Sequence, residues 1–107
     1  MRDRRGTQDL LPEKLLAIRE FLAFGEAEMA HSLKSDILSY IDGAYELRPA
    51  KISAYENGRL EPNLLVLVAY ARLGKVHLEL LADDRFTLNE FREQLGKQPS
   101  KRKRVTE

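Results

Sequence analysis

The stretch KISAYENGRLEPN, residues 51–63, decides the fold. Ile52 and Tyr55 are three residues apart, a spacing that places both side chains on one face of a short helix. Pro49 suits the first turn of that helix, because an N–H is not needed there, and Asn57-Gly58 is a typical left-handed cap at its end. Asn63, the last residue of the stretch, is a good N-cap for another helix. The stretch therefore predicts a short helix, a basic loop and a second helix start.

Downstream, apolar residues recur at helical spacing. A strongly apolar helix begins at Leu64 and stops near Gly74. A short helix follows over residues 77–82, with His77 as its polar cap. We expect the inward side chains of these two helices to be Leu64, Leu67, Val68, Ala71, Leu78 and Leu81. Tyr70 and Leu73 lie off this stripe and are candidates for a dimer face. A weaker sixth helix is indicated for residues 87–95, with Thr87 as its cap and Leu88, Phe91 and Leu95 on one side.

Upstream, two more helices are predicted. The first begins at Pro12 and turns Leu15, Ile18 and Leu22 to one side. The second follows Gly25, carries Met29, Leu33, Ile37 and Ile41 at steps of four, and ends at Asp42-Gly43. Five helices and no alternating strand pattern predict a compact all-α domain over residues 12–84. Residues 1–11 are expected to be a flexible arm, and residues 85–107 the weaker helix followed by a disordered basic tail.

Composition narrows the protein class. The chain has 107 residues, no Cys and two His, which argues against a disulfide scaffold, a thiolate site or a metal centre. Its longest apolar run is eight residues, well short of a membrane span. The net charge of +1 conceals an uneven distribution. Residues 13–84 hold eight basic and twelve acidic residues, whereas residues 85–107 hold seven basic and three acidic.

The deciding stretch resembles the helix-turn-helix domains of the lambda-repressor/Cro-like family, also called the xenobiotic-response-element family. The most specific match is Ile52-Ser53-x-Tyr55-Glu56-Asn57-Gly58-Arg59-x-Glu61-Pro62. It continues through Leu64-Leu65, Tyr70-Ala71-Arg72 and Val76-x-Leu78-x-x-Leu81-x-Asp83-Asp84. Weaker matches upstream are Leu15-x-x-Ile18-Arg19-Glu20 and Glu28-Met29-Ala30-x-x-Leu33. The resemblance implies a five-helix lambda-repressor-like domain whose helix near 26–33 positions a recognition helix near 49–57 in the DNA major groove.

The resemblance also implies roles for individual residues. The groove-facing set would be Arg48, Pro49, Ala50, Lys51 and Ala54, and the phosphate contacts would be Asn57 and Arg59. It further implies a largely buried ion pair between Arg19 and Glu56, which makes Glu56 a fold residue rather than a DNA contact. Breaking such a pair from one side costs about 3–5 kcal/mol.

The sequence departs from the family pattern in four ways. The positioning helix opens with Gly25-Glu26, where a phosphate-binding glutamine is usual, and a glutamate repels phosphate. Leu33 and Ile52 are nineteen positions apart, so residues 34–46 form an enlarged segment, interpreted as an extended second helix plus a long connector. The groove face is poor in Asn, Gln and Ser, so base readout would be shallow. The helical body is acidic, which opposes phosphate binding.

These observations favour a cytoplasmic, nucleoid-associated transcriptional regulator that binds double-stranded DNA as a homodimer, without a cofactor, metal, small ligand or membrane. The alternative is a protein-interaction module, antitoxin-like or adaptor-like, that uses residues 34–46 for contact. The basic run 101–104 is either a phosphate-binding tail or a solvated end. No catalytic Ser-His-Asp or Cys-His set and no glycine-rich phosphate loop is present, so we expect no enzyme.

Overall fold

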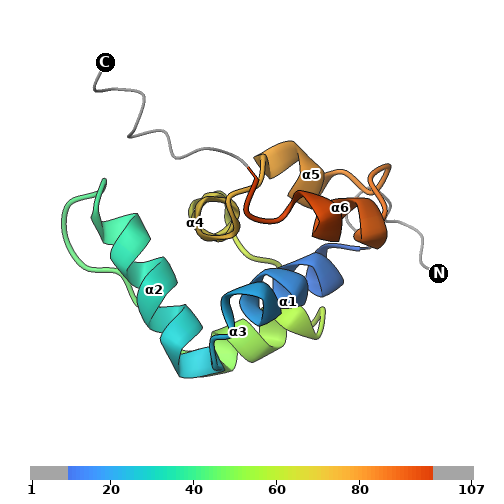
Figure 1. The fold of residues 1–107 in the computed structure, drawn as a ribbon. Helices are drawn as coiled ribbons and strands as arrows, with labels where there is room; N and C mark the ends of the chain where they lie inside the picture. Colours follow the sequence, from blue (N-terminus) through green and yellow to red (C-terminus); the bar gives the residue numbers. More distant parts are fainter. Residues whose placement is uncertain (1–9, 98–107) are drawn as a thin grey trace, which may run out of the picture.

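The computed structural model describes residues 10–97, and this part of the chain folds into α-helices without strands. The helices are α1 (Leu11–Leu22), α2 (Glu26–Leu38), α3 (Pro49–Glu56), α4 (Leu64–Gly74), α5 (Leu78–Ala82) and α6 (Leu88–Gln94) (Figure 1). The all-α prediction is confirmed, and the six described helices are the five of the expected domain plus the weaker helix expected near residues 87–95. None of them is long and apolar enough to cross a bilayer.

Helix α1 is the centre of the assembly, because it packs against α3, α4, α5 and α6 (Figure 1). Leu15 and Ile18 on its inner face are fully buried. The helix begins one residue earlier than expected, at Leu11, which is also buried. Leu10 is tied down as well, since its N–H donates to Asp84 Oδ1 at 3.0 Å. These two residues therefore belong to the folded body and not to the N-terminal arm.

The enlarged segment, residues 34–46, divides between the last turn of α2 and the connector that follows it. The helix continues only to Leu38, and Ser39 ends it by donating both its N–H and its hydroxyl to Asp36 O, at 3.1 and 2.6 Å. The expected continuation of the helix to Ile41 is wrong, because the chain leaves helical geometry at this capped end. Residues 39–48 form the connector, which is held at Tyr45, whose hydroxyl accepts a hydrogen bond from Asn63 Nδ2 at 3.0 Å.

Helix α4 has the predicted N-cap but a different buried face. Asn63 Oδ1 accepts the Val66 N–H at 3.0 Å. Leu67 and Ala71 of the expected stripe are buried, but Leu64 is 65% exposed and Val68 is only half-buried. Tyr70 is fully buried, so the idea of Tyr70 at a dimer face is wrong. The reason is that α1, α2 and α5 all pack against α4 and cover a wide arc of it, while Leu64 lies at its uncovered first turn.

A close junction between α1, α4 and the end of α6 completes the body. A Cβ on Gly74 would lie 3.1 Å from Ile18 Cγ1, so the missing side chain lets the two helices approach. Gly74 O also accepts the Gly96 N–H at 2.7 Å, and Phe21 lies directly over Gly96, which has a φ of +80°. Helix α6, expected only as a weaker appendage, is therefore part of the same body.

The two short C-terminal helices differ in their caps. Thr87 accepts the Glu90 N–H at 3.1 Å and Glu90 accepts the Thr87 N–H at 2.8 Å, a complete capping box at the predicted start of α6. Phe91, the predicted inward residue of α6, is fully buried. His77 occupies the N-cap position of α5, but its side chain makes no cap hydrogen bond, so the expectation of a polar cap there is wrong.

Lys14 is a fully buried charged residue of the core. Its ammonium donates to Leu80 O at 2.7 Å and to Asp83 O at 3.1 Å, and it lies 5.6 Å from the centre of the Phe91 ring. Burial lowers the pKa of Lys14 below its ordinary value, although the carboxylates of Asp84 and Asp83 act in the opposite direction. The lysine therefore satisfies carbonyl groups at the end of α5 and joins that end to α1.

Candidate nucleic-acid interface

Helix α3 carries most of the residues expected to contact DNA. Pro49 stands in its first turn, and Arg48 precedes it in extended conformation. Ile52 and Tyr55 are buried and hold one side of α3 against the body. The other side faces solvent, because an eight-residue helix packed against α1 and α2 keeps its remaining arc uncovered. The exposed arc is thus presented by a helix whose inner face is fixed.

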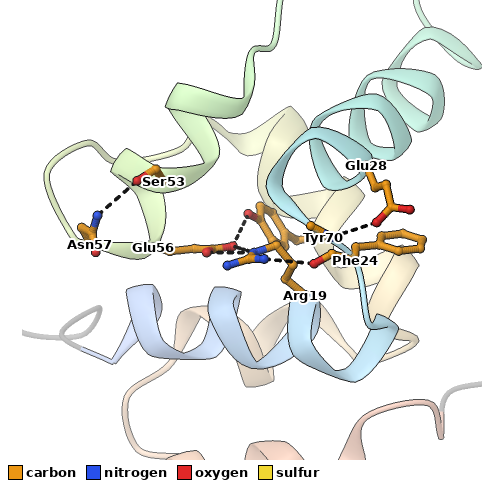
Figure 2. A network of polar contacts seen from close by, with 8 residues as sticks. Arg19, Phe24, Glu28, Ser53, Glu56, Asn57 and Tyr70 are labelled. Atoms are coloured by element: carbon orange, nitrogen blue, oxygen red, sulfur yellow. Dashed lines mark hydrogen bonds and ion pairs between the residues drawn. The ribbon is translucent and has the colours of Figure 1, made fainter.

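The C-terminal end of α3 is held by a four-membered polar network (Figure 2). Arg19 Nε donates to both oxygens of Glu56, at 3.0 and 2.9 Å, and Arg19 Nη1 donates to Phe24 O at 2.9 Å. Tyr70 donates its hydroxyl to Glu56 Oε2 at 3.4 Å. The expected ion pair between Arg19 and Glu56 is present, with side chains 19% and 5% exposed. Sequence reasoning missed Tyr70, because its spacing from Glu56 crosses a loop.

Electrostatics keeps the two side-chain donors of this network protonated. The hydrogen bond to Glu56 raises the pKa of Arg19 above its ordinary value, so the guanidinium stays charged. Burial, reinforced by the Glu56 charge, raises the pKa of Tyr70 well above its ordinary value, so its hydroxyl keeps the proton that it donates. The network therefore joins α1, the α1–α2 turn, α3 and α4 through two donors, Arg19 and Tyr70, that keep their protons.

The structure exposes the expected groove-facing residues, with one exception. Arg48, Pro49, Ala50 and Lys51 are exposed, and Ala54 is half-buried. Arg48 Nη2 lies 3.6 Å from Glu46 Oε2, a contact that the sequence analysis did not anticipate. Because both side chains are about three-quarters exposed, this ion pair is weak and Arg48 can exchange it for another anion. Lys51 projects its charge without a described ion-pair partner, as no ion pair within residues 10–97 includes it.

The expected phosphate contacts, Asn57 and Arg59, lie in the tight turn that follows α3. Asn57 and Arg59 are exposed, and Asn57 Nδ2 donates to Ser53 Oγ at 3.3 Å. The Arg59 N–H donates to Ala54 O at 2.9 Å, which folds the chain back onto the helix end. Gly58, with a φ of +78°, allows this reversal. The turn therefore positions the Asn57 amide and the Arg59 guanidinium next to the exposed arc of α3.

The N-terminus of α2 is occupied by the chain itself. Glu28 Oε1 accepts the Gly25 N–H at 2.8 Å (Figure 2), and Glu26 is a second acid in the first turn of α2. Two carboxylates at a helix N-terminus stabilise the helix dipole but repel a phosphate. The chemistry at this end of α2 thus opposes an anion contact, in line with the departure noted in the sequence.

The candidate interface, residues 48–59, consists of the exposed arc of α3 and the turn that follows this helix. It carries the cations Arg48, Lys51 and Arg59 on an otherwise acidic body. Within residues 10–97, His, Asp and Glu side chains form no group that could hold a metal ion. No protein-family model matches the chain, and neither a curated protein nor a solved structure does.

Proposed function

We propose that this chain is a DNA-binding transcriptional regulator of the helix-turn-helix type, in which α3 enters the major groove and α2 supports it. The observation that carries the proposal is the fixed presentation of α3. Its inner face is buried, its end is held by the Arg19–Glu56 network, and its outer arc offers Arg48 and Lys51 to a partner. A short rigid helix with exposed cations suits a groove lined by phosphates and base edges.

The side chains divide between positioning and readout. Asn57 and Arg59 contact the phosphate backbone and set the register, whereas Lys51 reaches a guanine edge or a phosphate. Pro49 and Ala50 can make only apolar contacts, for example with a thymine methyl group. The readout is therefore shallow, and much of the affinity comes from charge and falls as salt rises.

The proposed partner is double-stranded DNA, bound by a homodimer whose two α3 helices read half-sites about one helical turn apart. The cell compartment is the cytoplasm, at the nucleoid. No cofactor takes part in this binding. The basic run 101–104 lies outside the described residues, and its charge adds a sequence-independent contribution to affinity.

A selection of bound duplexes from a random pool, followed by titration of the selected and a scrambled duplex at several salt concentrations, tests the proposal. We expect tighter binding of the selected duplex, by at least about tenfold. Lys51→Ala should reduce that preference, and Arg59→Ala should weaken both duplexes alike and lower the salt dependence. Lys75→Ala, an exposed cation at the far end of α4, is the control. Equal affinity for every duplex, lost on truncation after Lys97, would contradict sequence recognition.

A second candidate function is a protein-interaction module on the same scaffold. It is favoured by the carboxylates at the α2 N-terminus and by Tyr40, which is 42% exposed on the connector. Tyr40 is held there by Arg72, whose guanidinium carbon lies 4.9 Å from the ring centre. The same titration separates the candidates, because absence of duplex binding at low salt favours the protein-interaction module.

A further inference from the structure

The end of the connector alternates between anchored and exposed side chains. Leu47 is buried, and the Tyr45 hydroxyl accepts a hydrogen bond from Asn63 Nδ2 at 3.0 Å. Glu46, between these two anchors, and Arg48, after them, are both exposed. Alternate side chains of an extended chain point to the same side, and Arg48 is extended, with φ and ψ of −106° and 158°. Glu46 and Arg48 therefore leave the anchored chain on one side.

This arrangement brings two opposite charges together at the start of α3. Arg48 Nη2 lies 3.6 Å from Glu46 Oε2. Arg48 is the N-cap of α3, and its carbonyl accepts the Lys51 N–H at 2.9 Å, so the two cations are one helical turn apart. An exposed carboxylate thus borders the candidate interface at its first cation.

The Glu46 carboxylate contributes little to the fold. The Arg48 and Glu46 side chains are 74% and 75% exposed, and an ion pair in such surroundings changes a folding equilibrium by about fivefold or less. The connector is instead held by Leu47 and Tyr45. A guanidinium that binds a carboxylate can bind a phosphate with the same planar set of donors. Glu46 therefore occupies a cation that the interface would use to hold an anion.

We propose that Glu46 is a positioning residue that competes with DNA phosphate for Arg48. In the free protein its carboxylate holds the guanidinium beside the start of α3, and on binding Arg48 exchanges this partner for a phosphate oxygen. A duplex carries one negative charge per about 1.7 Å of its axis, so it displaces a single exposed carboxylate. The inference rests on the proposed function, because the exchange takes place when α3 binds DNA.

The competition acts on affinity rather than on sequence preference. Phosphate contacts carry no base information, so Glu46 lowers the affinity for every duplex alike and leaves the preference to Lys51. The carboxylate opposes binding in two ways: its pair with Arg48 must open, and the released carboxylate then repels phosphate. Only the first of these depends on Arg48, which separates competition from repulsion.

Glu46→Gln tests the proposal in the titration of the selected and the scrambled duplex. The substitution keeps the size of the side chain and removes its charge. Affinity should rise about threefold to tenfold for both duplexes at low salt, and the gain should shrink as the salt concentration rises. Circular dichroism checks that the variant keeps the helical fold.

The same substitution in an Arg48→Ala background separates the two effects. No guanidinium is then held by Glu46, so Glu46→Gln should raise affinity by less than about twofold. Glu61→Gln is the matched control, because Glu61 is an exposed acid two residues beyond the interface and belongs to no ion pair among residues 10–97. Its effect should be the same in both backgrounds. Equal gains for Glu46→Gln in the two backgrounds would overturn the proposal.

A measurement without DNA tests the pair in the free protein. In nitrogen NMR of the full chain, the Arg48 Nε signal should shift on Glu46→Gln at low salt. The shift should vanish at about 1 M salt, where charges on the surface are screened over about 3 Å. The Arg59 Nε signal is the reference and should stay in place. An Arg48 signal that does not respond to Glu46→Gln would refute the pair.

Failure of this inference differs from failure of the proposed function. If α3 binds DNA but Glu46 does not compete, the duplex preference is retained and the gain from Glu46→Gln is independent of Arg48. If the NMR shift is present but neither wild type nor any variant binds a duplex at low salt, the proposed function and the competition are both refuted.

Discussion

The ion pair between Arg19 and Glu56 permits a quantitative prediction for Glu56→Gln. The substitution keeps the size of the side chain but removes its charge, so the Arg19 guanidinium loses its counter-ion and retains only neutral acceptors, among them Phe24 O. One-sided loss of a buried pair costs about 3–5 kcal/mol. The side chain of Arg19 is 19% exposed and gains some water, so the lower figure, about 3 kcal/mol, applies.

Urea denaturation followed by circular dichroism measures this loss of unfolding free energy. For a body of this size, about 3 kcal/mol corresponds to a fall in Tm of about 15 °C. Arg85→Gln is the control, because Arg85 and Asp83 approach to 2.7 Å but the Arg85 side chain is 88% exposed. If burial rather than distance determines the energy of an ion pair, the control variant should unfold at the wild-type midpoint.

A double-mutant cycle with Arg19→Gln completes the test. Once either partner is neutral, removal of the second charge should cost little, so the double variant should be less destabilised than the two single variants added together. Additive losses would refute the reasoning, and so would a loss for Glu56→Gln no larger than that for Arg85→Gln.

Substitutions at three further positions test a close helix contact, a helix cap and a buried charge. Gly74→Ala brings a methyl group to 3.1 Å from Ile18 and should cost about 1–3 kcal/mol in urea denaturation; an unchanged midpoint would contradict the close approach. Asn63→Ala removes the α4 cap and should cost about 1 kcal/mol, whereas Asn63→Asp, which keeps an acceptor, should cost less. For Lys14→Met, the comparison with wild type should depend on pH. Because folding lowers the pKa of Lys14, the unfolded chain binds more protons, so wild type should gain stability relative to Lys14→Met as pH rises toward 10.5; parallel pH profiles would contradict this.

Local signals explain why α3 and its surroundings were predicted accurately. Pro49, Asn57-Gly58 and Asn63 each act on the backbone within a few residues, so their effects can be read without the rest of the chain. The buried face of α4 could not be predicted in this way, because nearly every residue from Leu64 to Tyr70 is apolar. Which of them face inward depends on where α1, α2 and α5 lie.

Long-range contacts account for the other differences. Lys14 looks like a surface charge in the sequence, and its carbonyl partners at Leu80 and Asp83 are 66 and 69 residues away. For the candidate interface, helical spacing correctly separated the exposed Lys51 from the buried Ile52 and Tyr55. The contact of Arg48 with Glu46 and the hydroxyl of Tyr70 on Glu56 depend on rotamers and tertiary packing, which a pattern of residue types does not contain.

The junction at Gly74 also bears on where the chain can be cut. The family resemblance ends at residue 84, which would be a natural choice for a minimal fragment. Such a fragment would remove Phe91 from the core, uncover Phe21 and leave the Gly74 carbonyl without the Gly96 N–H. The shortest piece that keeps its own core closed therefore begins by Leu10 and extends through Gly96, and deletions intended to isolate the basic tail should start beyond that glycine.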